Sequence, residues 1–126
     1  MSITRALYTK PYQSNSLCYN RNGSFELSEY IRPGENVNCF DSAAGLTTVA
    51  GLVGIRVFPK EQTWIQGPYP NTYWGEHSYA VFNNQVYDAC SAMSSLINGL
   101  DFWLYQKLIK PRWDSEIKDL PITEIK

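Results

Sequence analysis

VNCFDSAAGLTTVAGLVGIRV, residues 37–57, is the stretch that indicates the fold most clearly. Small and apolar residues recur in it at alternating steps of four and three, the spacing that lines one face of a helix. Asn38 is suited to the N-cap and Gly54 to the helix stop. We therefore predict a buried helix over residues 39–53, followed by a strand over residues 55–58. The residues on the predicted buried face are Cys39, Ala43, Leu46, Ala50 and Val53.

A second stretch, HSYAVFNNQVYDA at residues 77–89, has the pattern of a β-hairpin. Two β-rich runs flank Asn83 and Asn84, a residue type that tolerates the positive φ of a tight turn. With a two-residue turn, Asp88 becomes the diagonal neighbour of His77 on one face, at a separation of about 7 Å. One residue more in the turn would move Asp88 to the other face. The pairs that this turn predicts are Phe82 with Gln85, Val81 with Val86, Ala80 with Tyr87, Tyr79 with Asp88 and His77 with Cys90.

The other segments have weaker patterns. Residues 1–35 indicate loops, with one short helix around residues 25–30. Residues 59–76 indicate a long ordered loop, because aromatic residues alternate there with Gly and Pro. Apolar spacing predicts another helix over residues 93–108, and the alternative is that Asn98-Gly99 splits it in two. The charged tail after residue 113 is expected to pack loosely.

The composition indicates one folded domain. The chain has 126 residues, of which 44% are hydrophobic, enough to form a core without disulfides or metals. Its 11 basic and 12 acidic residues give a net charge of −1, which argues against a nucleic-acid-binding surface. The sequence has no apolar run of the roughly 20 residues needed to cross a bilayer, and its N-terminus lacks the apolar core of a secretory signal. We therefore expect a soluble single domain over residues 1–126, with no nucleic-acid partner and no membrane span.

Cys39 is the first candidate catalytic residue, because it falls in the first turn of the predicted helix. The positive end of the helix dipole favours a thiolate there, and the amide of Cys39 is free to bind a developing oxyanion. Asp41 lies three residues after the N-cap, where a carboxylate is favourable. The alternative is that Cys39 only packs, since free cysteine is among the most buried residue types.

His77 and Asp88 complete a candidate catalytic set with Cys39. His77 is the only histidine in the chain, and the hairpin register brings Asp88 within reach of its ring. A thiol, an imidazole and a carboxylate that orients the imidazole are the nucleophile, base and orienting group of acyl transfer.

Other roles are open to the cysteines. Cys90 is a rival nucleophile because the same register places it opposite His77, but it has no helix terminus to favour its thiolate. A zinc site of Cys39, His77 and Cys90 lacks paired ligands at short spacing, and we expect no cofactor. Three cysteines leave at least one free in a monomer, and a bridge between Cys18 and Cys90 stays open.

The stretch CFDSAAGLTTVAGLVGIRV resembles the nucleophile helix of transglutaminase-like cysteine enzymes, in which Cys is followed by an acidic residue, Ala, apolar residues and Gly-Ile. EHSYAVFNNQVYDA looks like the second and third blocks of that family, where a histidine begins one strand and an aspartate ends the next. The resemblance covers roughly residues 38–89. It implies Cys39 as nucleophile, His77 as base and Asp88 as orienting group. It also implies an α+β fold of the papain/transglutaminase-like type, with the nucleophile helix packed on an antiparallel sheet.

The activity that this resemblance implies is ping-pong acyl transfer, with a glutamine side chain of a protein as the favoured substrate. The chain would then be a deamidase or a transglutaminase, and a cysteine protease or peptidoglycan amidase of the same fold is the alternative. Members of the family also use a Trp or Gln side chain as a second oxyanion donor. The substrate-binding candidates are Trp64, Trp74, Tyr79 and Asn38, and the candidates for the second donor are Gln13, Asn36, Trp64 and Trp74.

The size of the chain adds one further expectation. A stand-alone domain this small resembles the effector and toxin domains that bacteria deliver into other cells through secretion systems, which implies a protein target and a neutralising partner protein. The competing class is a non-catalytic binding module that keeps the fold. Such a module would bury Cys39 as an inert thiol, whereas an enzyme needs that thiol to be accessible.

Overall fold

The computed structural model describes residues 1–15, 17–66, 73–93 and 95–126. Most of its helices lie in the N-terminal part of the chain, and most of its strands follow them. In chain order the elements are α1 (Ser2–Tyr8), β1 (Ser24–Phe25), α2 (Leu27–Tyr30), α3 (Cys39–Leu52), β2 (Phe58–Gln66), β3 (Tyr73–Phe82), β4 (Gln85–Asp88), β5 (Ile97–Asp101), α4 (Phe102–Ile109), β6 (Ile117–Asp119) and β7 (Glu124–Ile125).

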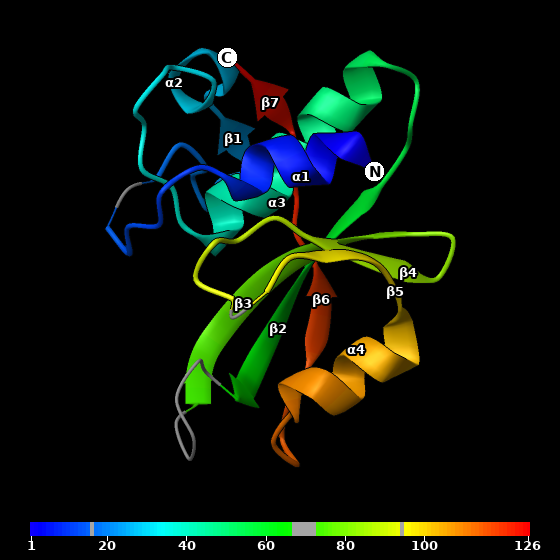
Figure 1. Cartoon of the computed structure of the whole chain (residues 1–126). Helices are drawn as coiled ribbons and strands as arrows, with labels where there is room; N and C mark the ends of the chain where they lie inside the picture. Colours follow the sequence, from blue (N-terminus) through cyan, green and yellow to red (C-terminus); the bar gives the residue numbers. More distant parts are fainter. Residues whose placement is uncertain (16, 67–72, 94) are drawn as a thin grey trace.

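Five of the strands form an antiparallel sheet in the order β5-β4-β3-β2-β6. A separate two-stranded parallel sheet joins β1 to β7, so the C-terminal end of the chain lies beside an N-terminal segment. Figure 1 shows α1, α2, α3 and this small sheet on one side of the five-stranded sheet, with α4 on the other side. Helices that cover an antiparallel sheet confirm the predicted α+β class.

Apolar side chains fill both faces of the five-stranded sheet. Consecutive strand residues point to opposite faces, so the central strands β3 and β4 contribute to the clusters on both faces. The cluster toward α3 contains Leu46, Ala50, Val57, Ala80 and Tyr87. The cluster toward α4 contains Ile65, Tyr79, Val86, Ile97, Tyr105 and Ile109. A third cluster, between α3 and the N-terminal segment, contains Cys18, Tyr19, Phe25, Tyr30, Val37, Ala43, Ala44 and Leu120.

The helix predicted over residues 39–53 is confirmed as α3. The side chain of Asn38 caps it by accepting a hydrogen bond from the amide of Asp41 at 3.0 Å. Past the other end, Gly54 has a φ of 83°, which favours glycine because it has no Cβ. The strand predicted over residues 55–58 is mostly wrong, because β2 begins only at the last of these residues.

The hairpin of β3 and β4 has the predicted turn and register. Asn83 and Asn84 form the turn with φ values of 50° and 61°. The ladder ends before β4 does, so the pairs predicted at Tyr79 and at His77 lie beyond it. The pairs present are Ala80 with Tyr87, Val81 with Val86 and Phe82 with Gln85.

The loop predicted over residues 59–76 is wrong in its described part, because those residues belong to β2 and β3. Residues 67–72 lie outside the described part of the chain. Only Gln62 and Ile65 of β2 are buried, so the strand has no apolar alternation that would reveal it. Hydrogen bonds to β3 on one side and to β6 on the other stabilise it instead.

The helix predicted over residues 93–108 is wrong in its first half, which forms β5. Gly99 has a φ of 91°, outside the helical region, and Asp101 caps α4 by accepting hydrogen bonds from two of its amides. The helix therefore begins only after Asp101. It buries Tyr105 and Ile109, whereas the leucines that gave the predicted spacing lie on its exposed side.

Both ends of the chain have more structure than the sequence predicted. The first residues form α1, which was not predicted, and the short helix expected around residues 25–30 is α2. The tail after residue 113 supplies β6 and β7, and its Leu120 is buried. Among the described residues, no helix is both long and apolar enough to cross a membrane.

Candidate active site

Cys39 is the first residue of α3, and its position is fixed by a capping box. The Asn38 side chain accepts a hydrogen bond from the Asp41 amide at 3.0 Å, and Asp41 Oδ2 accepts one from the Asn38 amide at 3.1 Å. Cys39 itself is partly exposed, unlike the two other cysteines, which are buried. The thiol therefore combines a rigid backbone with access to solvent.

Asp41 ties this helix start to the N-terminal segment. Its fully buried carboxylate accepts hydrogen bonds from the amides of Cys18 and Tyr19 through Oδ1, the latter at 2.8 Å. Burial raises the pKa of Asp41 to about 6, while these amides and that of Asn38 act in the opposite direction. The sequence predicted that Asp41 contributes to the helix cap. It did not predict that Asp41 also binds the amides of Cys18 and Tyr19, about twenty residues earlier in the chain.

His77 and Asp88 are both buried and are joined by a hydrogen bond of 2.6 Å between Nε2 and Oδ2. Asp88 Oδ2 also accepts a hydrogen bond from the Tyr105 hydroxyl at 2.7 Å. Its other oxygen, Oδ1, accepts one from the Cys90 amide at 3.0 Å. Three donors from three different elements or loops therefore hold the carboxylate in place, and the carboxylate orients the imidazole.

The second ring nitrogen of His77, Nδ1, is buried and has no hydrogen-bond partner among the residues that the structure describes. Cys39 is a close neighbour of this ring, since its thiol group raises the pKa of His77. The thiol and Nδ1 do not reach the geometry of a formed hydrogen bond. Catalytic hydrogen bonds are often long in an enzyme without substrate and shorten only in the reacting complex.

Opposing effects act on the pKa of His77. Burial lowers it, because the charged imidazolium loses its water. The charge and the hydrogen bond of Asp88, together with Cys39, raise it by more than burial lowers it. The pKa of His77 is therefore raised above its ordinary value, which favours the imidazolium at neutral pH.

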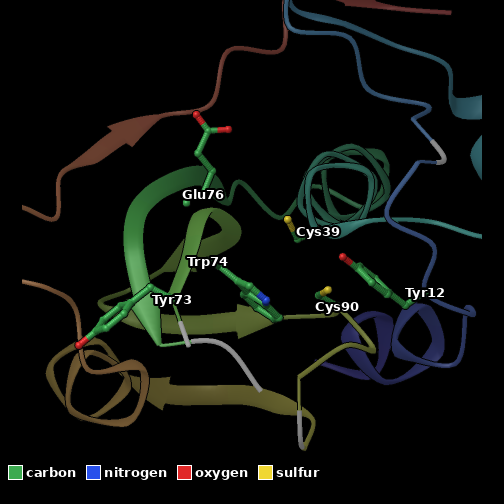
Figure 2. Close-up of a pocket in the computed structure, with 7 residues that line it drawn as sticks. Tyr12, Cys39, Tyr73, Trp74, Glu76 and Cys90 are labelled. Carbon is green, nitrogen blue, oxygen red and sulfur yellow. The ribbon is translucent and has the colours of Figure 1, made fainter. Parts of the chain in front are cut away.

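A cavity of about 220 Å³ opens beside Cys39. Figure 2 shows the thiol of Cys39 at this cavity, with the rings of Tyr12 and Trp74 on either side of it. Trp74 also packs on His77, with 5.0 Å between ring centroids. The residues that line the cavity are Tyr12, Cys39, Tyr73, Trp74, Gly75, Glu76 and Cys90.

The three cysteines differ in their surroundings, and none forms a disulfide. Burial and the charge of Asp41 raise the pKa of Cys18 to about 12. Burial and the charge of Asp88 also raise the pKa of Cys90, so both residues are held as neutral thiols. Cys90 lines the same cavity as Cys39, but its side chain is only 1% exposed.

The substrate-binding candidates fall in different places. Trp74 lines the cavity, and Trp64 does not. The ring of Trp64 packs instead against the Arg112 guanidinium, whose Cζ lies 4.0 Å from the ring centroid. Tyr79 is buried and donates a hydrogen bond to Gln62 Oε1 at 2.6 Å, so it supports the sheet behind His77. Asn38 is the helix cap and has no side-chain surface in the cavity.

Sequence reasoning missed two parts of the site. Tyr105 and Gln106 lie on α4, whose start was predicted wrongly, and Tyr105 reaches Asp88 on the face of the sheet that α4 covers. Gln106 and Gln62 exchange two amide hydrogen bonds, at 2.7 and 2.9 Å. Tyr12 lines the cavity from a segment that has no periodic pattern. No local signal in the sequence would have identified these residues, because only the tertiary fold brings them to Cys39 and His77.

Comparison of the chain with models of known protein families found no match. Comparisons with curated proteins and with solved structures also found no significant match. In the described part of the chain, no group of three His, Cys, Asp or Glu side chains is placed to hold a metal ion. The geometry of Cys39, His77 and Asp88 is therefore the main indication of function.

Proposed function

We propose that this protein is a cysteine-dependent acyl-transfer enzyme of the papain/transglutaminase-like type, acting on carboxamides of a protein target. The arrangement of His77 carries the proposal. One ring nitrogen is held by Asp88 at 2.6 Å, while the other is buried, unpartnered and beside the Cys39 thiol. Most buried polar atoms have hydrogen-bond partners, so an unpartnered ring nitrogen beside a thiol supports a reactive histidine over a purely structural one.

In the proposed reaction Cys39 is the nucleophile, His77 first donates and then takes back a proton, and Asp88 orients His77. The Cys39 thiolate attacks the carbon of a carboxamide, and the developing oxyanion is bound by the amide at the start of α3. The His77 imidazolium donates its Nδ1 proton to the leaving nitrogen, so ammonia departs and a thioester remains on Cys39. Water or an amine then attacks the thioester while Nδ1 takes the proton back. Asp88 keeps Nε2 engaged throughout, so that Nδ1 stays directed at the reacting atoms.

The size of the cavity supports a side-chain amide as the substrate. Its volume of about 220 Å³ is below the roughly 300–1,000 Å³ of sites that enclose a drug-sized ligand. Such a space suits a single glutamine side chain better than a stretch of peptide on both sides of a scissile bond. The aromatic ring of Trp74 would pack on the methylene groups of that side chain.

Alkylation of Cys39 by iodoacetamide tests the thiol and imidazole pair without a substrate. We expect rapid labelling of Cys39 at neutral pH, located by peptide mass, and much slower labelling in His77→Ala. Cys18→Ala is the control, since that buried thiol has a raised pKa and lies outside the cavity. If Cys39 is labelled only after unfolding, or equally fast in His77→Ala, the proposal is wrong and a binding module is the better interpretation.

Product analysis then separates the possible reactions. An N-blocked glutaminyl-glycine dipeptide with hydroxylamine should give a hydroxamate and ammonia, and both should disappear in Cys39→Ala. Ammonia without hydroxamate would indicate a deamidase, and shortened peptides would indicate a protease. Loss of turnover in Cys90→Ala with retention in Cys39→Ala would make Cys90 the nucleophile and overturn the assignment.

A further inference from the structure

Tyr12 is held beside the start of α3 by its backbone. It forms an isolated parallel bridge with Val37, the residue before the helix cap. Two hydrogen bonds of 2.9 Å make this bridge, from the Gln13 amide to the Val37 carbonyl and from the Val37 amide to the Pro11 carbonyl. The position of Tyr12 relative to Cys39 is therefore set by main-chain pairing rather than by a free loop.

The hydroxyl of Tyr12 is directed at the thiol. Figure 2 shows its oxygen pointing toward Cys39 across the cavity that both residues line. Burial raises the pKa of Tyr12, and a charge on Cys39 raises it further, so the hydroxyl remains protonated. Tyr12 is 45% exposed and lines the cavity, so its hydroxyl proton is accessible to a ligand there.

We propose that Tyr12 is the second oxyanion donor of this site, acting together with the amide at the start of α3. This inference rests on the proposed acyl-transfer function. The tetrahedral intermediate would form at the carbon attacked by Cys39, and its oxygen would lie between the helix amide and the Tyr12 hydroxyl. Two donors aimed at one developing charge are the arrangement that acyl transfer requires. Tyr12 would thus be a catalytic residue and not only a wall of the cavity.

The donors suggested by the sequence are less well placed. Asn36 donates a hydrogen bond to Gln13 at 2.9 Å, and neither side chain lines the cavity. Trp64 lies outside the cavity against Arg112. Trp74 lines it, but its ring packs on His77, on the other side of the thiol from Tyr12 in Figure 2. Trp74 is therefore the one rival that the experiment has to separate from Tyr12.

The test compares two reactions of the same thiol. Acetylation of Cys39 by p-nitrophenyl acetate forms a tetrahedral oxyanion before p-nitrophenolate leaves and the acetyl thioester remains. Alkylation by iodoacetamide is a direct displacement of iodide at a saturated carbon, with no oxyanion at the reacting centre. Both rates are measured for the wild type, Tyr12→Phe, Trp74→Phe and Tyr87→Phe, with the modified residue located by peptide mass. Tyr87→Phe is the matched control, because it removes a hydroxyl bonded to Gln85 away from the cavity.

We expect Tyr12→Phe to slow acetylation by about 10²-fold, the usual effect of removing one oxyanion donor, and to leave alkylation unchanged. Tyr87→Phe should change neither rate. Equal acetylation of the wild type and Tyr12→Phe would overturn the assignment of Tyr12 alone. Equal slowing of both reactions would also overturn it, since Tyr12 would then position the thiol. A slowing of acetylation in Trp74→Phe but not in Tyr12→Phe would give the role to the indole.

One further outcome separates this inference from the function on which it rests. If the wild-type thiol is alkylated in a His77-dependent way but never acetylated, the site does not stabilise an oxyanion. That result would overturn the acyl-transfer proposal and the role of Tyr12 together. Thermal unfolding of Tyr12→Phe serves as the check on folding, and we expect little change because the Tyr12 side chain is 45% exposed.

Discussion

His77 is the residue on which the chemistry of the site depends. It is the only histidine in the chain, so its ring protons give a single set of signals in an NMR titration. The hydrogen bond and charge of Asp88 outweigh the effect of burial and raise the pKa of this ring above the ordinary value. Its protonation state can therefore be followed directly, without a substrate and without an assay of activity.

We expect Asp88→Asn to lower the pH at which His77 loses its proton. In the wild type the imidazolium signals should persist through neutral pH and titrate only on the alkaline side. Replacing the carboxylate by an amide removes the charge that opposes burial, so His77 should become neutral at or below its ordinary value of 6.5. If the His77 ring of the wild type is already neutral at pH 7, Asp88 does not raise its pKa and the prediction is wrong.

The same pair makes a stability prediction with a definite sign. A histidine whose pKa is raised on folding stabilises the native state fully below the unfolded value of 6.5. That contribution is lost as the pH rises through the raised native value. Urea unfolding should therefore show the wild type losing stability relative to Asp88→Asn between neutral and alkaline pH. If the free energy of unfolding of the wild type, relative to that of Asp88→Asn, stays constant or grows as the pH rises, the prediction is wrong.

Among the elements, α3 combines the site with the densest packing of the helical part. Gly45 lies in its middle, directly against the ring of Tyr30, which is fully buried. A Cβ at this position would overlap the ring, whereas Gly51 on the same helix has open space around its Cα. The two glycines have the same helix propensity, so a comparison between them isolates the effect of packing.

We expect Gly45→Ala to destabilise the protein and Gly51→Ala to stabilise it. Overpacking against Tyr30 should cost about 1–3 kcal/mol and outweigh the gain in helix propensity. At Gly51 only the propensity acts, and the free energy of unfolding should rise by up to about 1 kcal/mol. Urea unfolding of the two variants measures both effects. Stabilisation by both substitutions would show that Tyr30 moves aside and that the contact is not close.

The helix α3 and the hairpin of β3 and β4, which carry the proposed catalytic residues, were predictable because their signals are local. The cap and the apolar spacing define α3, and a two-residue Asn turn fixes the register that brings Asp88 to His77. β2 and α4 were not predictable from their own residues. β2 is mostly polar and depends on strands at both sides, and Asp101 starts α4 in the middle of an apolar run. Tyr105 was missed for that reason, although it holds Asp88.

In the whole molecule, the site lies where the helical part and the five-stranded sheet meet. α3 and the N-terminal segment supply Cys39 and Tyr12, while the five-stranded sheet and α4 supply the groups around His77. The C-terminal residues connect these parts, since β6 pairs with β2 and β7 pairs with β1. Figure 1 shows this segment running from the sheet to the helical side. The last residues should therefore affect stability although none of them touches the cavity.

We expect deletion of residues 121–126 to lower the free energy of unfolding by about 2–4 kcal/mol, through lost hydrogen bonds and lost burial. The deletion removes hydrogen bonds of 2.8 Å from the Thr123 amide to the Gly23 carbonyl and from the Lys126 amide to the Phe25 carbonyl. It also removes the Pro121 carbonyl, which accepts from the Tyr19 hydroxyl at 2.5 Å.

Glu124→Ala is the matched control for this deletion, because it changes an exposed side chain in β7 and leaves the main-chain pairing intact. It should alter stability by less than about 0.5 kcal/mol. Urea unfolding of both variants, with iodoacetamide labelling of Cys39 in the folded state, measures the effect on stability and on the site separately. A deletion as stable as the wild type would mean that the β1–β7 pairing contributes nothing to stability. Lower stability with unchanged labelling would assign the C-terminal segment to the connection between the two parts and not to the chemistry.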